Sequence, residues 1–194
     1  MVALPQQNWT PEAYLAFERA SEEKHEYLAG EIFLMTGASR RHNLIVVNTV
    51  ISLGNQLKGR NCEVYASDMR VWIPALDSYT YPDVAIVCGL ARFEDDQVDT
   101  LLNPTVVVEV LSPTTEVYDR GRKFHAYRTL PSLREYLLIS QDRGRIERYL
   151  RQDDGLWLFS DTTLAEAVLE LPSVGCTLAM ADVYDKVTFE DDSA

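Results

Sequence analysis

The sequence predicts an α/β fold in which a mixed β-sheet is flanked by helices. Residues 105–111, TVVVEVL, form a run of β-branched types that is typical of a buried central strand. Residues 119–129 show a helical pattern, and residues 135–140, EYLLIS, form a second apolar run. A strand, a helix and a further strand make a βαβ unit, so we expect these two strands to be parallel.

The N-terminal part of the chain is predicted to contain two helices separated by a small hairpin. Thr10 suits the N-cap and Pro11 the first helical position, so the first helix should run to about Ala20. We expect the hairpin over residues 27–35 and a long helix over residues 39–58. Apolar or small residues recur at helical spacing in the long helix and predict its core-facing side: Leu44, Val47, Val50, Ile51, Leu53, Gly54 and Leu57.

Strand-like patterns replace the helical ones in the middle of the chain. Residues 63–73 alternate partly and predict one strand, and residues 74–80 predict a turn region. Residues 81–87 predict a short buried strand, which the acidic loop 89–103 joins to the central strand. The sheet therefore gains two strands before the βαβ unit begins.

The C-terminal part is predicted to form a hairpin extension. Residues 145–151 and 156–159 flank a turn at residues 153–155, Asp-Asp-Gly. A last strand and a short helix at 179–184 follow, and the acidic tail 190–194 is expected to fray.

Length and composition fit a single domain over residues 1–194, with a core at about 39–160. The net charge of -12 argues against a protein that coats nucleic acid non-specifically. Positive charge nevertheless concentrates in segments 40–75 and 113–151, which flank an acidic centre. These segments are either part of a solvated surface of mixed sign or the walls of a polyanion groove around a metal site.

Cysteine usage and hydropathy bear on the cellular compartment. The three cysteines, Cys62, Cys88 and Cys176, have the spacing of neither a disulfide framework nor a zinc site, which favours a reducing compartment. Residues 1–9 lack the features of a signal peptide, and no apolar run is long enough to span a bilayer. We therefore expect a cytoplasmic protein without membrane contact.

Two acidic residues occupy positions where burial is costly. Glu109 lies inside the apolar central strand, and Asp83 stands at the start of the strand before it. If the two strands pair, both carboxylates can share one face, where their repulsion would be removed by a divalent cation. Oxygen-only ligands favour Mg²⁺ or Mn²⁺. Taken singly, each acid could instead form a salt bridge with an arginine.

Lys123 is the candidate basic residue for the same site. It lies on the helix that follows the Glu109 strand, next to Phe124 and four residues before Tyr127. A crossover helix folds back over the sheet, so an inward-facing lysine can reach a position beside Glu109. There it could orient or deprotonate a water held by the metal and neutralise charge on a phosphate. The alternative is a solvated helical lysine.

These segments together resemble a known family. YPDVAIV, VVVEVLSP and the pair Asp119 and Lys123 are similar to the bacterial "putative restriction endonuclease" family of the PD-(D/E)XK nuclease superfamily. The segment HEYLAGEIFLMTGASRRH, residues 25–42, fits the family's N-terminal pattern, and residues 135–140 fit its following strand.

The resemblance implies a restriction-endonuclease-like core that binds a divalent metal for phosphodiester hydrolysis. It implies that Asp83 and Glu109 ligate the metal, with the main-chain carbonyl of Val110 as a further ligand. Leu111 stands where the superfamily pattern has its lysine, and the resemblance implies that Lys123 takes over that role.

Two further residues are candidates of second rank for the site, and three arginines are candidates for contact with nucleic acid. Glu31 could project from the hairpin toward the site, and His42 opens the long helix; a solvated turn acid and a helix-capping histidine are the alternatives. Arg120, Arg122 and Arg128 could grip the phosphates of a nucleic acid, or could form a solvated basic face.

Three functions are compatible with these observations. The first is a metal-dependent nuclease that hydrolyses phosphodiester bonds in DNA. The second is a catalytically inactive nuclease-fold module that binds nucleic acid or a protein partner, which the net charge and the displaced lysine favour. The third is a metal-dependent hydrolase of a smaller phosphoester. A homodimer would suit cleavage of both DNA strands, although no sequence feature specifies one.

Overall fold

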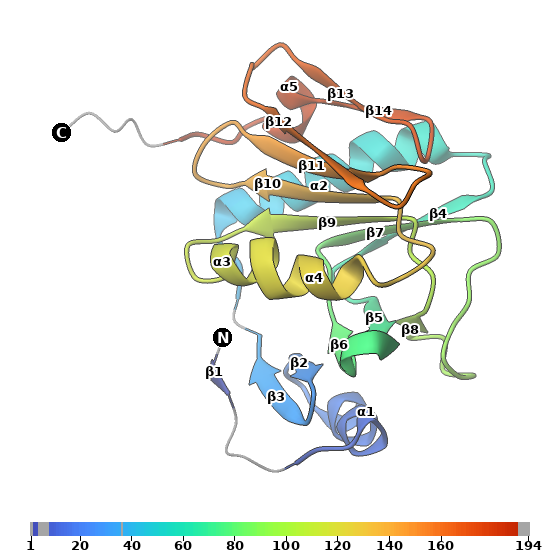
Figure 1. The fold of residues 1–194 in the computed structure, drawn as a ribbon. Helices are drawn as coiled ribbons and strands as arrows, with labels where there is room; N and C mark the ends of the chain where they lie inside the picture. Colours follow the sequence, from blue (N-terminus) through green and yellow to red (C-terminus); the bar gives the residue numbers. More distant parts are fainter. Residues whose placement is uncertain (1, 4–7, 36, 190–194) are drawn as a thin grey trace.

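The central sheet is mixed, and its two middle strands are the predicted parallel pair. The computed structural model describes residues 2–3, 8–35 and 37–189 of the 194-residue chain. β9 (Val106–Leu111) and β10 (Glu135–Ser140) run parallel, whereas the other neighbours in this sheet run antiparallel. The strand order is β12-β11-β10-β9-β7-β4, and the remaining members are β4 (Cys62–Ala66), β7 (Val84–Cys88), β11 (Ile146–Arg151) and β12 (Trp157–Thr162) (Figure 1).

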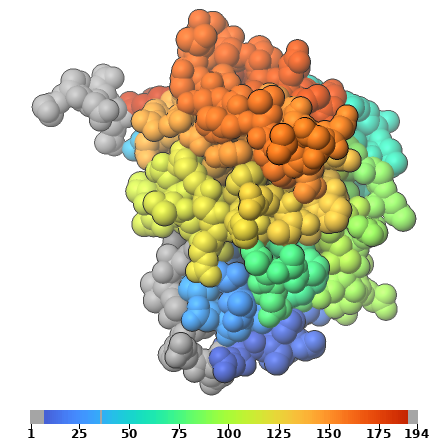
Figure 2. Space-filling view, in the orientation of Figure 1, coloured from blue at the N-terminus to red at the C-terminus, as the bar shows by residue number. Residues whose placement is uncertain are grey.

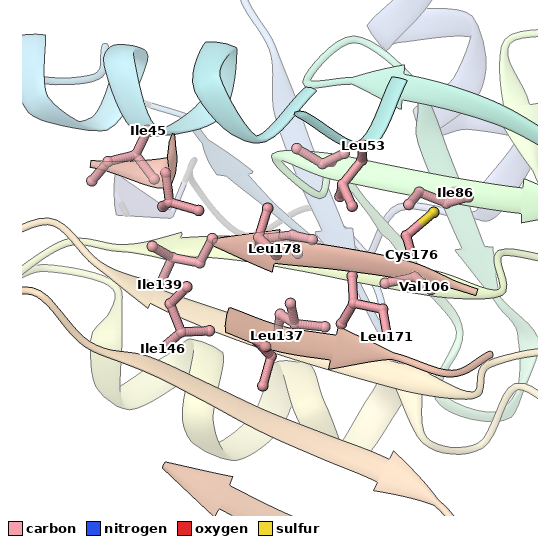
Figure 3. Packing of buried hydrophobic residues seen from close by; sticks show 14 of the residues in the cluster. Ile45, Leu53, Ile86, Val106, Leu137, Ile139, Ile146, Leu171, Cys176 and Leu178 are labelled. Atoms are coloured by element: carbon pink, nitrogen blue, oxygen red, sulfur yellow. The ribbon is translucent and has the colours of Figure 1, made fainter. Parts of the chain in front are cut away.

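β9 is buried on both faces, and its alternating side chains meet two different layers. The even-numbered valines belong to the core under the long helix α2 (Arg40–Leu57), as Figure 3 shows for Val106. The odd-numbered side chains, Glu109 among them, point to the opposite face. The helical segment 116–127 covers that face, so the strand delivers its carboxylate beneath this segment.

The crossover helix is a continuous helical segment of three parts: α3 (Glu116–Tyr118), a π-helical turn (Asp119–Lys123) and α4 (Phe124–Tyr127). It confirms the predicted helix, although it begins three residues earlier than the pattern indicated. In the space-filling view this segment, in yellow, lies between the C-terminal strands in orange and the N-terminal strands in blue (Figure 2). The segment therefore lies between two layers of strands.

A second mixed sheet brings the N-terminal part of the chain against the central one. The predicted first helix is α1 (Pro11–Ala20), with the Thr10 side chain as N-cap. The predicted hairpin also forms, around a turn in which Ala29 and Gly30 both have positive φ, as a type I′ turn requires. In the order β1-β3-β2-β6-β5-β8, the strands are β1 (Val2–Ala3), β3 (Glu31–Leu34), β2 (His25–Leu28), β6 (Ser78–Thr80), β5 (Arg70–Ile73) and β8 (Thr100–Leu101) (Figure 1).

The prediction of one strand over residues 63–73 is wrong. The segment divides into β4, which pairs with β7 in the central sheet, and β5, which pairs with β6 in the second sheet. The division falls at a turn that is closed by a hydrogen bond of 3.1 Å from the Met69 N–H to the Ala66 carbonyl. The predicted turn region after it contains the short helix Pro74–Leu76 and then β6.

The predicted core-facing side of α2 is only partly correct. Val47 and Ile51 are 53% and 56% exposed. The buried positions follow a spacing of four residues from Ile45 through Leu53, on the side of the helix that lies opposite Val47. Apolar residues therefore occur on two sides of this helix, and only one of them packs on the sheet.

The C-terminal segment forms a hairpin where one last strand was predicted. β13 (Val168–Leu171) and β14 (Cys176–Ala179) pair antiparallel, and α5 (Met180–Val183) follows as predicted. Figure 3 shows Leu171 and Leu178 of this hairpin in the core cluster beneath α2. The predicted tail 190–194 lies outside the described residues.

The prediction that the cysteines form no disulfide is also wrong. Cys62 and Cys88 are register partners in the β4–β7 ladder, their Cα atoms are 4.0 Å apart, and they form a disulfide. The neighbouring hydrogen bond from Gly89 N–H to the Asn61 carbonyl marks theirs as a non-hydrogen-bonded pair, the kind with the closest Cα approach. Cys176 is free and buried. Over the described residues, no helix is long and apolar enough to cross a membrane.

Reduction of the Cys62–Cys88 disulfide should destabilise the protein. The bond closes a loop with a sequence separation of 26 residues, and loss of such a constraint on the unfolded chain costs about 2–4 kcal/mol. Urea unfolding with and without a reductant should show this difference, and Cys62→Ser with Cys88→Ser should reproduce it. The double variant should then be insensitive to reductant. Equal urea midpoints for oxidised wild type, reduced wild type and the double variant would contradict the disulfide.

Candidate active site

A cavity of about 580 Å³ opens where the carboxyl end of β9 meets the first turn of α2 and the helical segment 116–127. Its walls include Asp83, Glu109, Val110, Lys123 and His42. The cavity therefore collects the three residues expected to carry the chemistry, the residue expected to add a main-chain ligand, and one residue of second rank.

Asp83 and Glu109 face each other across the β7–β9 ladder. These strands are antiparallel with Val84 opposite Val108, so extending the register by one residue places Asp83 opposite Glu109, on the same face. The Val110 N–H donates a hydrogen bond of 2.7 Å to Asp83 Oδ2. Glu109 is 3% exposed. The structure thus has the pairing that the sequence argument required.

Lys123 reaches this pair from the crossover helix. Its Nζ lies 3.0 Å from Glu109 Oε1 and 2.9 Å from Oε1 of Glu26, a residue of β2. Asp119 Oδ1, one turn earlier on the same segment, is 3.9 Å away. All four side chains are buried. Lys123 is therefore a buried ammonium surrounded by carboxylates from three elements.

The electrostatics of the cavity are dominated by an excess of negative charge. Burial raises the pKa of Glu109 well above its ordinary value, against the opposing effect of Lys123, and burial likewise raises the pKa of Asp119. Burial would lower the pKa of Lys123, but Glu109 and Glu26 outweigh it and hold this pKa well above its ordinary value. The lysine therefore remains protonated, and its single positive charge compensates several carboxylates.

His42 is brought into the site by the start of α2. The backbone N–H of His42 donates a hydrogen bond of 3.0 Å to the N-cap side chain of Ser39, which fixes the first turn of the helix. Its Nε2 lies 3.2 Å from Asp83 Oδ2. Its Nδ1 is buried and finds no hydrogen-bond partner within the described part of the chain. His42 thus orients Asp83, in addition to opening the helix.

Four predicted residues lie outside the cavity walls. Glu31 is exposed at the start of β3. Arg120 is bound to Glu147 at 2.8 Å and to Glu116. Arg122 and Arg128 are exposed on the helical segment. The geometry does not bring these arginines to the cavity, and their contact with nucleic acid stays a prediction.

Two cavity residues, Glu26 and Asp119, were not predicted as members of the site. Glu26 lies in the strand HEYL, which is not an apolar run, so the burial argument applied to Glu109 does not single it out. Glu31 was chosen from this hairpin instead. Asp119 precedes Lys123 by four residues, a spacing that places both side chains on one side of a helix.

The donor set fits a metal held by few protein ligands. Across residues 2–3, 8–35 and 37–189, no three His, Cys, Asp or Glu side chains form a group that could hold a metal ion. Lys123 takes the position between Glu26, Glu109 and Asp119. Mg²⁺, however, is commonly bound through one or two carboxylates and several waters. Asp83 and Glu109, beside a cavity with room for water, meet that requirement.

The chain belongs to the Uma2 family, described as "Putative restriction endonuclease", whose model matches residues 11–181. This match confirms the resemblance seen in the sequence. Two relatives from Synechocystis sp. are uncharacterized proteins. One is 40% identical over 180 residues and covers 93% of both chains. The other is 38% identical over 161 residues, covering 83% of this chain and 91% of that one.

The crystal structure of a "putative nuclease" from Anabaena variabilis has the same fold. It matches 93% of this chain and 99% of that chain with a TM-score of 0.74, at 18% sequence identity. At this identity the likeness concerns the fold alone, and it confirms the predicted nuclease-like α/β architecture.

Removal of the buried ammonium should destabilise the protein in a pH-dependent way. Lys123→Met leaves Glu26, Glu109 and Asp119 without a counter-charge, which should cost about 3–5 kcal/mol at pH 7. A carboxyl whose folded-state pKa is raised binds its proton more tightly when folded, so stability is lost as the pH rises through that pKa. The loss of stability caused by Lys123→Met should therefore be smaller at pH 5 than at pH 7. Urea unfolding at both pH values measures it, with Lys58→Met, at an exposed lysine, as control.

Proposed function

We propose that the protein is a metal-dependent nuclease that hydrolyses phosphodiester bonds in DNA. One observation carries the proposal: two carboxylates, Asp83 and Glu109, share one face at the end of the central sheet, and the ammonium of Lys123 lies 3.0 Å from one of them. Membership of a family of "putative restriction endonucleases" supports the same conclusion.

Asp83 and Glu109 would hold Mg²⁺ or Mn²⁺, with the main-chain carbonyl of Val110 as a further ligand. When bound, the metal supplies Lewis-acid polarisation of the scissile phosphate. The surplus of buried carboxylates over the single Lys123 supports a cation at this place, because it would relieve the repulsion between them. That repulsion adds to the effect of burial in raising the pKa of Glu109.

Lys123 acts as a fixed positive charge. Its raised pKa keeps it protonated, so it neutralises negative charge that develops on the phosphate and does not take the proton of the attacking water. The Val110 N–H and His42 both contact Asp83 Oδ2, which leaves Oδ1 as the oxygen that would bind the metal. The chain thus supplies a pre-oriented anion and a pre-oriented cation in the walls of the cavity.

Family membership supports nucleic acid as the substrate class. A nuclease acts on nucleic acid, and DNA is the form that we propose. With a net charge of -12 and Arg120 already paired, affinity should come from few phosphate contacts. Cleavage of both strands by one such site per chain would require two copies, so a homodimer forms part of the proposal.

Cleavage of DNA should depend on Asp83 and on Lys123. With plasmid DNA and single-stranded oligonucleotides under a Mg²⁺ or Mn²⁺ titration, Asp83→Asn and Lys123→Ala should each lower the rate about 100- to 1,000-fold. Asp96→Asn and Lys58→Ala, at exposed positions outside the cavity, are the matched controls. Cutting that survives in Asp83→Asn would mean that the activity belongs to a contaminant or to another site.

Metal binding should stabilise the folded protein even where no cleavable substrate is known. Mg²⁺ at about 100 times its dissociation constant adds about 2.7 kcal/mol, which a thermal melt should register as a higher midpoint. Asp83→Asn should lose this response and Asp96→Asn should keep it. A wild-type protein without any response to Mg²⁺ or Mn²⁺ would instead favour the inactive module that binds nucleic acid or a protein.

A further inference from the structure

Glu26 reaches the cavity from outside the central sheet. It lies on β2, in the second sheet, and is 2% exposed. Asp83 and Glu109 belong to the region where β7 and β9 of the central sheet pair, and Lys123 to the crossover helix. The ammonium of Lys123 is therefore the point at which the two sheets and the helical segment between them meet.

The two oxygens of Glu26 differ in their surroundings. Oε1 lies 2.9 Å from Lys123 Nζ and accepts a hydrogen bond of 3.2 Å from the Tyr81 N–H. Oε2 is buried and has no hydrogen-bond partner within the described residues. An unsatisfied buried carboxylate oxygen costs free energy, and such exceptions call for an explanation other than stability. Glu26 also lines the cavity.

The residue that donates a hydrogen bond to Glu26, Tyr81, is itself firmly held. The Tyr81 hydroxyl donates a hydrogen bond of 2.8 Å to Glu18 and accepts a hydrogen bond of 3.0 Å from Arg70. All three side chains are buried. Tyr81 in turn donates its N–H to Glu26. Because Tyr81 holds Glu26 in place, Glu26 can in turn hold the more flexible side chain of Lys123. A lysine has a flexible four-carbon stem and depends on its acceptors for a defined position.

We propose that Glu26 is a positioning residue for Lys123. Glu26 Oε1 and Glu109 Oε1 hold the ammonium at the edge of the cavity, so that it faces the phosphate in one orientation. The N-terminal hairpin thereby completes a site whose other members come from the central sheet and its crossover helix. This role rests on the proposed nuclease function and extends it to a residue of the second sheet.

Two variants of Glu26 and one control test this role. Glu26→Ala removes the contact, whereas Glu26→Gln keeps an oxygen that can accept a hydrogen bond from Lys123. Glu23→Gln changes an exposed acid three residues away. If Glu26 positions Lys123, Glu26→Ala should lower kcat about 10- to 100-fold with KM nearly unchanged. Glu26→Gln should recover part of kcat, and the control should match wild type.

The position of Lys123 can also be followed without any substrate. In ¹⁵N-labelled protein, a held ammonium exchanges its protons slowly enough to give a resolved signal, which Lys123→Ala assigns by its loss. The Lys123 signal should shift or disappear in Glu26→Gln and stay unchanged in Glu23→Gln. A signal unchanged in Glu26→Gln, or a wild-type kcat in Glu26→Ala, would overturn the role of Glu26.

The two hypotheses fail in different ways. If wild-type protein cleaves no DNA or RNA under any metal tested, the nuclease proposal fails, and the ammonium signal alone decides whether Glu26 holds Lys123. If wild type cleaves and Glu26→Ala cleaves equally well, the nuclease proposal stands and the role of Glu26 is rejected. A thermal melt of each variant shows that the comparison is made between folded proteins.

Discussion

The burial of one ammonium among three carboxylates is the interaction on which the arrangement of the layers depends. A buried lysine is stable only when its charge is compensated, and Lys123 draws that compensation from β2, from β9 and from its own helical segment. Neither sheet can move away from the helix without leaving a buried charge unpaired. Functional groups held in this way start out oriented, which is what electrostatic catalysis requires.

Much of the central sheet could be predicted because its signals are local. The β-branched run of β9, the helical pattern after it and the apolar run of β10 each lie within a few residues, and the parallel pairing follows from their order. The same rule explains why Lys123 could be assigned to the site: a crossover helix must return over the sheet, next to the strand that carries Glu109. The burial cost of Glu109 then marked the site itself.

The remaining features depend on pairings that local patterns do not encode. Alternation in residues 63–73 indicates strand but not which sheet receives each half, and only the register of β4 with β7 brings Cys62 opposite Cys88. Glu26 was missed for the same reason. Its partner lies far along the chain, so nothing near it in sequence shows that the carboxylate meets an ammonium.

The two ends of the chain contribute to the cavity and to the core. A fragment restricted to residues 39–160 would keep Asp83, Glu109 and Lys123, yet it would lack β2, which supplies one carboxylate to the ammonium, and the hairpin β13–β14, which fills the core beneath α2. Such a fragment would not be portable as a module for fusion to another protein. An engineered transfer of this site needs the chain from the first helix to α5.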